Sequence, residues 1–139
     1  MNEITFEEFK ERVRFKLKFL EFAPIMTVSA KSGMRIDKIL PNVKKVFDEY
    51  SRNISTAPLN DCFEKAILRN PMSSYRGKFV KMFYATQVKN KPPTFKCFLN
   101  FPEAIHFSYK RYLINSMGKS FCLMGTPVRL ILAEKKEGP

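Results

Sequence analysis

The order in which hydrophobic periodicity changes after residue 55 limits the fold of this chain more than any other feature of its sequence. Apolar residues recur at helical spacing over 59–69, alternate with polar ones over 78–87 and 94–99, return to helical spacing over 105–117, and end in a short β-type run over 128–133. This pattern predicts the order helix-strand-strand-helix-strand. The simplest packing of these elements is an α+β unit, in which two helices cover one face of a three-stranded sheet.

The amino-terminal part of the chain shows a separate succession of elements. The periodicity predicts a helix over 5–20, a short buried strand over 24–28 and a second helix over 36–50. A polar stretch that ends in a proline, over 53–58, interrupts the helical patterns on both sides. We therefore expect two structural parts, residues 1–54 and residues 55–139.

Positive charge is concentrated in the second of these parts. The chain holds 25 Lys and Arg against 13 Asp and Glu, which gives a formal net charge of +12. Residues 56–139 alone carry 14 basic and 5 acidic side chains. Such an excess favours a polyanionic partner and argues against a neutral scaffold, although it says nothing about the fold.

The cysteines and the single histidine give no sign of a metal or catalytic centre. Cys62, Cys97 and Cys122 are too far apart to form a CxxC pair, and their odd number is typical of a reducing compartment. His106 has no evident Cys or carboxylate partner. The sequence lacks both a long apolar run and the apolar core of a secretory signal. We therefore expect a cytoplasmic protein with no membrane span, no metal site and no catalytic residues of its own.

Alternation along the three predicted strands divides their side chains between two faces. We expect one face to pack against the helices through Val80, Met82, Tyr84, Phe95, Cys97, Leu99, Val128, Leu130 and Leu132. The open face would then carry Lys81, Phe83, Lys96, Phe98, Arg129 and Ile131. Basic side chains interleaved with aromatic rings suit single-stranded RNA, because cations contact phosphates while rings stack on bases. The alternative is that this face packs against another protein domain.

Further basic residues lie outside the predicted open face. They are Lys78, Lys89, Lys91, Lys110, Arg111 and Lys119. Each of them alone is explained by an ordinary solvated surface, since lysine is mostly exposed in proteins. As a set they favour a non-specific attraction to RNA that weakens steeply with salt.

Several short motifs follow one another in a distinctive order. In the second part these are Tyr84-Ala85-Thr86-Gln87, Pro92-Pro93-Thr94-Phe95, Phe98-Leu99-Asn100, Ser108-Tyr109-Lys110-Arg111-Tyr112-Leu113 and Gly125-Thr126-Pro127-Val128-Arg129. Upstream they are Phe22-Ala23-Pro24-Ile25 and Ser29-Ala30-Lys31-Ser32-Gly33. The chain resembles, over nearly its whole length, the carboxy-terminal region of the EngA (Der) family of bacterial double GTPases. The resemblance implies a KH-like domain over 55–139, preceded over 1–54 by a helix-strand-helix remnant of a P-loop GTPase domain.

The same resemblance implies a role in assembly of the large ribosomal subunit. The expected partners are rRNA or the subunit itself, and the GTPase domains of a parent chain that would use GTP and magnesium. This sequence contains no GxxxxGK[ST] loop, whose amides and lysine hold the phosphates in such enzymes. Of the guanine-binding motifs only Ser29-Ala30-Lys31 is similar. We therefore expect no cofactor and no useful GTP affinity for this chain, so that any hydrolysis belongs to the parent.

The resemblance leaves two functions open. The unit either binds rRNA, or it is a protein-interaction module whose basic sheet face docks the GTPase domains without contacting RNA. The RNA-clamping GxxG loop of other KH domains is missing, since no two glycines are three residues apart. A remnant of a GTPase sheet would also leave apolar faces and a strand edge unpaired. We therefore expect residues 1–54 to dock on the KH-like unit, to pair with a second chain or to be partly disordered, and self-association through this part is one hypothesis.

Overall fold

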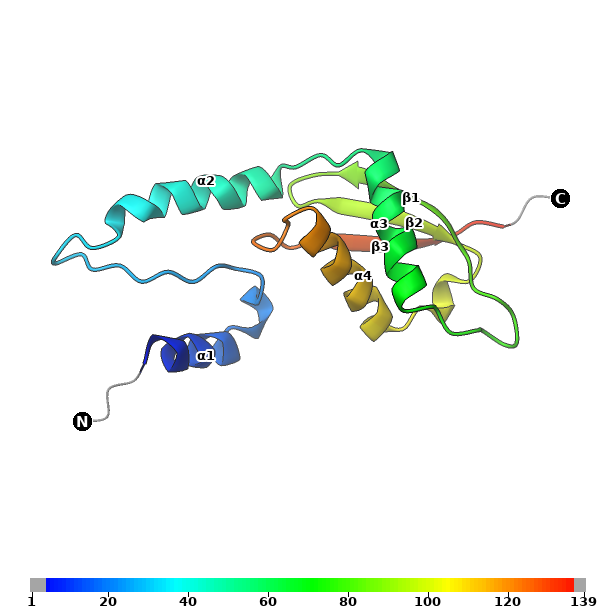
Figure 1. The fold of residues 1–139 in the computed structure, drawn as a ribbon, viewed down its shortest axis with the longest axis horizontal. Coiled ribbons are helices and arrows are strands. Elements are labelled where there is room, and N and C mark those ends of the chain that lie inside the picture. Colours follow the sequence, from blue (N-terminus) through cyan, green and yellow to red (C-terminus); the bar gives the residue numbers. More distant parts are fainter. Residues whose placement is uncertain (1–4, 137–139) are drawn as a thin grey trace.

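Three strands form the sheet around which the second part of the chain folds (Figure 1). The computed structural model describes residues 5–136. Strand β1 (Met82–Lys89) pairs antiparallel with β2 (Thr94–Leu99), and β2 pairs parallel with β3 (Arg129–Glu134), so that β2 is central. The predicted three-stranded sheet is therefore confirmed.

Two helices, α3 (Thr56–Arg69) and α4 (Phe107–Ser120), cover one face of the sheet (Figure 1). A short 3₁₀ helix, η3 (Pro102–Ala104), precedes α4. The core consists of apolar side chains from both helices and from the inner face of the sheet, among them Leu59, Phe63, Phe95, Cys97, Leu99, Leu113 and Met117. The predicted order of elements and the inward face of β2 are both confirmed.

The alternation predicted for β1 is wrong from Tyr84 onward. Met82 pairs with Leu99, and Tyr84 pairs with the adjacent Phe98. Phe83, between them, has no partner on β2 and is the extra residue of a β-bulge. The bulge shifts the phase of the strand by one residue. Ala85 is completely buried against the helices, whereas Tyr84 is 39% exposed on the open face.

The amino-terminal part contains helices but no strand within residues 5–54. Its elements are α1 (Phe6–Lys16), η1 (Lys18–Leu20), η2 (Ile36–Lys38) and α2 (Ile39–Tyr50). Residues 24–28, predicted as a strand, have no paired strand beside them. A strand needs a neighbour to bind its backbone groups, and the described chain supplies none here. Pro41 lies in the first turn of α2, where a missing N–H breaks no helical hydrogen bond.

The carboxyl end of α2 is attached to the sheet unit by polar contacts. Glu49 is only 5% exposed, and its Oε2 accepts a hydrogen bond from the Gly125 amide at 2.9 Å. The Arg52 guanidinium donates to the Phe121 carbonyl. Gln87 of β1 donates to the Arg52 carbonyl at 2.8 Å and accepts from the Ile54 amide at 2.6 Å. These bonds fix the direction in which α2 leaves the sheet unit.

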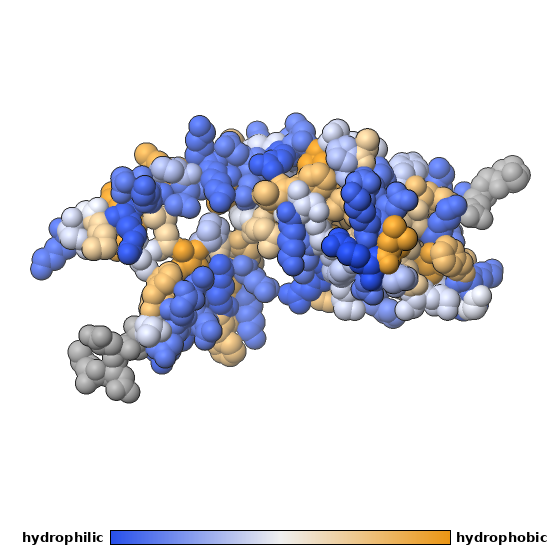
Figure 2. Space-filling model, viewed as in Figure 1, coloured by the Kyte–Doolittle hydropathy of each residue, from blue (hydrophilic) through white to orange (hydrophobic). Residues whose placement is uncertain are grey.

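The rest of the amino-terminal part exposes large apolar side chains. Leu40 of α2 is 78% exposed, and Phe15 of α1 and Phe19 of η1 are each 73% exposed. Figure 2 shows such apolar residues at the surface of this part, whereas hydrophilic residues dominate over α3. None of the helices in residues 5–136 is long and apolar enough to span a membrane.

Candidate nucleic-acid interface

The open face of the sheet is centred on two stacked aromatic rings. Tyr84 of β1 and Phe98 of β2 are paired across the strands, and their ring centroids lie 4.5 Å apart with an angle of 26° between the rings. This separation is typical of an offset stack between aromatic side chains. The β-bulge at Phe83 creates the stack, because it turns Tyr84 away from the helices.

Three lysines lie over the rings of this face. Lys96 Nζ is 5.3 Å from the centroid of Phe98, and Lys81 Nζ is 5.4 Å from that of Phe83. Lys135 Nζ lies 4.8 Å from the Tyr84 centroid and 5.8 Å from the Phe83 centroid. All four distances are within the range of a cation–π interaction. We call this surface the sheet platform, which consists of Lys81, Phe83, Tyr84, Lys96, Phe98 and Lys135.

The lysines of the sheet platform keep their full positive charge available to a ligand. The four ion pairs found within residues 5–136 involve none of the three. Arg129 and Ile131, both exposed, lie along β3 at the border of the platform. An unpaired base can stack on the rings while the flexible lysines move from the ring faces to the flanking phosphates.

Sequence reasoning missed two members of the sheet platform, Tyr84 and Lys135. Tyr84 was placed inward because strict alternation cannot register a bulge. Lys135 was missed because the predicted strand ends at residue 133, whereas β3 ends at Glu134. Lys135 continues the alternation of Arg129, Ile131 and Ala133 on the open face. The backbone amide of Lys135 donates to the Leu99 carbonyl at 2.8 Å, which holds it beside β2.

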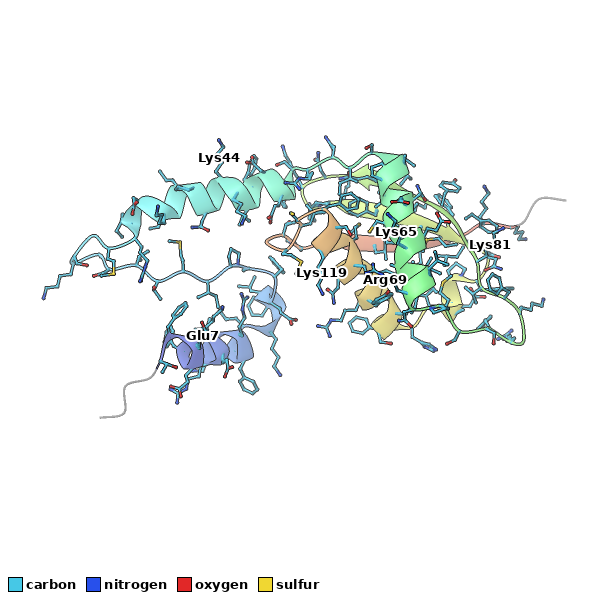
Figure 3. All side chains as sticks on the ribbon, viewed as in Figure 1. Glu7, Lys44, Lys65, Arg69, Lys81 and Lys119 are labelled. Atoms are coloured by element: carbon cyan, nitrogen blue, oxygen red, sulfur yellow. The ribbon has the colours of Figure 1, made fainter. Side chains whose placement is uncertain are left out.

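The remaining predicted basic residues do not join the sheet platform. Lys89 and Lys91 lie at the β1–β2 connection, where the Lys91 amide donates to Tyr50 of α2 at 2.8 Å. Lys110, Arg111 and Lys119 belong to α4, on the helical side of the sheet. Figure 3 shows Lys119 on this side, together with Lys65 and Arg69 of α3.

Arg111 is the one predicted RNA contact that has an acidic partner within residues 5–136. Its guanidinium lies 3.2 Å from the Glu21 carboxylate, and both side chains are exposed. Such a surface pair contributes little to stability. The cations of α4 and those of the sheet platform therefore lie on opposite sides of the sheet.

Tyrosine and cysteine side chains in the core have packing roles. Burial, with a smaller contribution from Tyr112, raises the pKa of Tyr109 to about 12, and its hydroxyl donates to the Asn70 carbonyl at 2.7 Å. Tyr112 donates to the Ala66 carbonyl at 2.6 Å. Burial also raises the pKa of the Cys97 thiol to about 12. Burial therefore holds Tyr109 and Cys97 in their protonated forms, and the two tyrosine hydroxyls join α4 to α3 and its C-cap residue Asn70.

The Ser29-Ala30-Lys31 motif lies in a loop of the amino-terminal part. The Ser29 amide donates to the Met34 carbonyl at 3.0 Å, and the Ser29 carbonyl accepts from the Gly33 amide at 2.8 Å. The segment that holds the motif precedes η2 and α2 in the chain, and Figure 1 shows this segment past the end of α2 that points away from the sheet. Within residues 5–136, no three His, Cys, Asp or Glu side chains are grouped so that they could hold a metal ion.

The fold and the open cationic face define a small α+β domain of KH-like type. A family described as the KH-domain-like, carboxy-terminal domain of EngA bacterial GTPases matches residues 53–132, and the chain belongs to this family. The predicted boundary between residues 54 and 55 itself stays a prediction.

The similar curated proteins are named GTPase Der. The protein from Caldanaerobacter subterraneus is 46% identical over 134 residues, which are 96% of this chain and 30% of the relative. That from Moorella thermoacetica is 43% identical over 98% of the chain and 31% of its own length. That from Desulforapulum autotrophicum is 49% identical over 91% of the chain and 26% of its own length. The chain therefore spans about 30% of the length of the relatives it matches.

Proposed function

We propose that this chain is the RNA-binding part of a Der-type GTPase and that its sheet platform contacts single-stranded segments of rRNA during assembly of the large ribosomal subunit. The observation that carries the proposal is the Tyr84–Phe98 stack surrounded by Lys81, Lys96 and Lys135. Rings stack on bases of any sequence, and lysines neutralise the backbone between them. The cations of α4 and of the β1–β2 connection add non-specific attraction at longer range.

In this proposal GTP hydrolysis belongs to the parent protein. The phosphate-binding loop that such chemistry requires does not occur in the sequence of this chain. The Ser29-Ala30-Lys31 loop supplies a guanine contact only when the remainder of a GTPase domain surrounds it. GTP and magnesium would accordingly act in the parent and bind this chain too weakly to matter. The whole protein would work in the bacterial cytoplasm, where its RNA partner is made.

The competing function is docking of the parent's GTPase domains on the same face. Ile131 favours it, because this apolar side chain is 46% exposed beside the sheet platform. An interface with a protein would also bury the aromatic rings. The two functions differ in the ligand that the lysines bind, and a binding experiment separates them.

The test is fluorescence anisotropy of labelled 23S rRNA fragments titrated with this chain at two salt concentrations. We expect affinity to fall steeply with salt, and the triple variant Lys81→Ala/Lys96→Ala/Lys135→Ala to lower the salt slope by about 2, since each phosphate contact on a single strand contributes about 0.7. The matched control is Lys16→Ala/Lys18→Ala/Lys44→Ala, which removes the same charge from α1, η1 and α2. Equal salt slopes of RNA affinity for the two triple variants would contradict the proposal. So would a chain that binds GTPase domains and not RNA.

A further inference from the structure

A tight, rigid turn projects two cations from the end of the sheet unit. Between α3 and β1, the Tyr75 amide donates to the Lys78 carbonyl and the Lys78 amide donates to the Tyr75 carbonyl, both at 2.9 Å. The two residues between them, Arg76 and Gly77, have φ angles of 50° and 75°. Positive φ at both central positions is the geometry of a two-residue hairpin turn of type I′. We call residues 75–78 the cationic turn.

Arg76 occupies a backbone conformation that does not suit it. Type I′ turns favour Asn, Asp or Gly at this position, because left-handed backbone is strained for most other residues. Gly77 supplies the freedom required at the second position, but Arg76 does not. Strained residues of this kind persist where surrounding structure holds them, and they cluster at binding sites. The strained backbone therefore makes Arg76 a candidate for a binding role.

The two cations of the turn are held against a pair of aromatic rings. The centroids of Tyr75 and Phe101 are 5.6 Å apart. The guanidinium carbon of Arg76 lies 5.1 Å from the Tyr75 centroid, and Lys78 Nζ lies 5.9 Å from the Phe101 centroid. No ion pair found within residues 5–136 includes either cation. The charges are thus pre-positioned but not neutralised.

The segment between the turn and β1 is fixed by the carboxamide of Asn100. Its Nδ2 donates to the Phe79 carbonyl at 2.9 Å, and its Oδ1 accepts from the Lys81 amide at 2.9 Å. Phe79, which follows the turn directly in the chain, is 81% exposed, so an apolar ring faces solvent there. Because Lys81 belongs to the sheet platform, only two residues separate the cationic turn from that surface. Figure 1 shows this segment emerging past the end of α3 and lying next to η3.

We propose that the cationic turn binds the sugar–phosphate backbone of the RNA strand whose bases lie on the sheet platform. The proposal rests on the proposed function, since it extends the same RNA site beyond the sheet. The planar fork of the Arg76 guanidinium matches two phosphate oxygens, and Lys78 adds a point charge. The exposed ring of Phe79, the residue after Lys78, offers a surface on which a base can stack. The turn thereby does the work for which other KH domains use their GxxG loop.

The experiment uses the full chain and a fluorescein-labelled, 16-nucleotide single-stranded RNA of mixed sequence. The variant Arg76→Asn removes the charge but places a residue that suits the left-handed backbone. We expect this variant to melt at the same or a higher temperature than the original chain, and to bind the RNA about 5-fold more weakly near 0.1 M salt, with a salt slope smaller by about 0.7. Arg76→Lys keeps the charge and should preserve the slope. Arg69→Gln, which removes one charge from α3, is the control for net charge.

The outcomes separate this inference from the proposed function. If the original chain binds no RNA, the proposed function fails and the inference fails with it. If the original chain binds RNA and Arg76→Asn matches Arg69→Gln in affinity and slope, the inference alone is overturned. If Arg76→Asn loses binding to purified GTPase domains while its RNA binding is unchanged, the turn contacts a protein partner and the inference is overturned.

Discussion

The carboxamide of Asn60 binds both backbone groups of Ala85. Asn60 Oδ1 accepts from the Ala85 amide at 2.7 Å, and Nδ2 donates to the Ala85 carbonyl at 2.8 Å. Asn60 belongs to α3 and Ala85 to β1, which is an edge strand. The helix therefore covers the strand edge at the point where another chain would otherwise pair with it.

Asn60→Ala should lower the free energy of unfolding by about 2–4 kcal/mol, because it leaves two buried backbone groups of Ala85 without partners. Urea denaturation followed by circular dichroism measures the change. Asn115→Ala on α4 is the matched control, since Asn115 is exposed and belongs to a helix of the same sheet unit. Equal effects of the two substitutions would show that the Asn60 contact does not secure the edge.

Gly125→Ala should destabilise the attachment of α2 to the sheet unit. A methyl group at position 125 would lie 2.6 Å from Glu49 Oε2, the atom that accepts the Gly125 amide. Overpacking of this kind costs about 1–3 kcal/mol. The loss should shrink when Glu49→Ala is also present, because the clash is then removed. Gly118→Ala is the control, since its methyl would meet the flexible Met124 side chain at 3.3 Å and the Leu123 carbonyl at an ordinary contact distance of 3.9 Å. Additive losses in the double variant would contradict this account.

The three cysteines should differ in reactivity. Cys122 is exposed, whereas Cys62 and Cys97 are buried, and burial raises the pKa of the Cys97 thiol from 9.0 to about 12. Since the thiolate is the reactive form, a colourimetric thiol reagent at pH 8 should modify Cys122 quickly and the other two only after urea is added. Rapid modification of Cys97 in the folded chain would show that the core around β2 is open.

The same pKa shift has a consequence for stability. In the folded state Cys97 stays protonated up to about pH 12, whereas in the unfolded chain its thiol ionises near pH 9. The contribution of this group to the free energy of unfolding is therefore fully present below pH 9 and is lost as the pH rises toward 12. The Cys97→Ala variant should lose this part of the alkaline dependence. Denaturation midpoints between pH 8 and pH 11 measure it, and identical alkaline profiles of the two chains would contradict it.

Self-association of the chain should follow from its exposed apolar residues. Leu40, Phe15 and Phe19 are more than 70% exposed, and exposed apolar surface of this kind favours association between copies of a chain. Light scattering over a concentration series should show an increasing mass, more so in salt that screens the net charge of +12. Leu40→Glu should reduce the association, and Val88→Glu, on β1, is the control. A strictly monomeric chain at all concentrations would end this prediction.

Much of the sheet unit could be predicted because β2 and β3 are short and alternate regularly. Lys96 and Phe98 were placed correctly on the open face, since Phe95, Cys97 and Leu99 must fill the core between them. Tyr84 could not be placed, because a bulge depends on the pairing of two strands and has no fixed sequence signal. Arg76 was not recognised, although Gly77 after it is a sign of a tight turn.

The strand predicted over 24–28 shows a different limit. Its apolar run is compatible with a strand, but a strand forms only beside a partner, and residues 5–136 provide none. Periodicity describes the preference of a segment and not the presence of its neighbour. For the same reason the exposure of Leu40 and Phe15 could be anticipated only from the resemblance to a larger domain.

The most direct test of the account is ultraviolet cross-linking of the chain to 23S rRNA, followed by identification of the linked peptides. We expect cross-links at Tyr84 and Phe98 of the sheet platform, and their loss from the double variant Tyr84→Ala/Phe98→Ala. The exposed ring of Phe15, which lies 4.7 Å from Lys18 Nζ, provides the matched control outside the platform. Cross-links confined to α3 and α4, or equal cross-linking at Phe15, would contradict it.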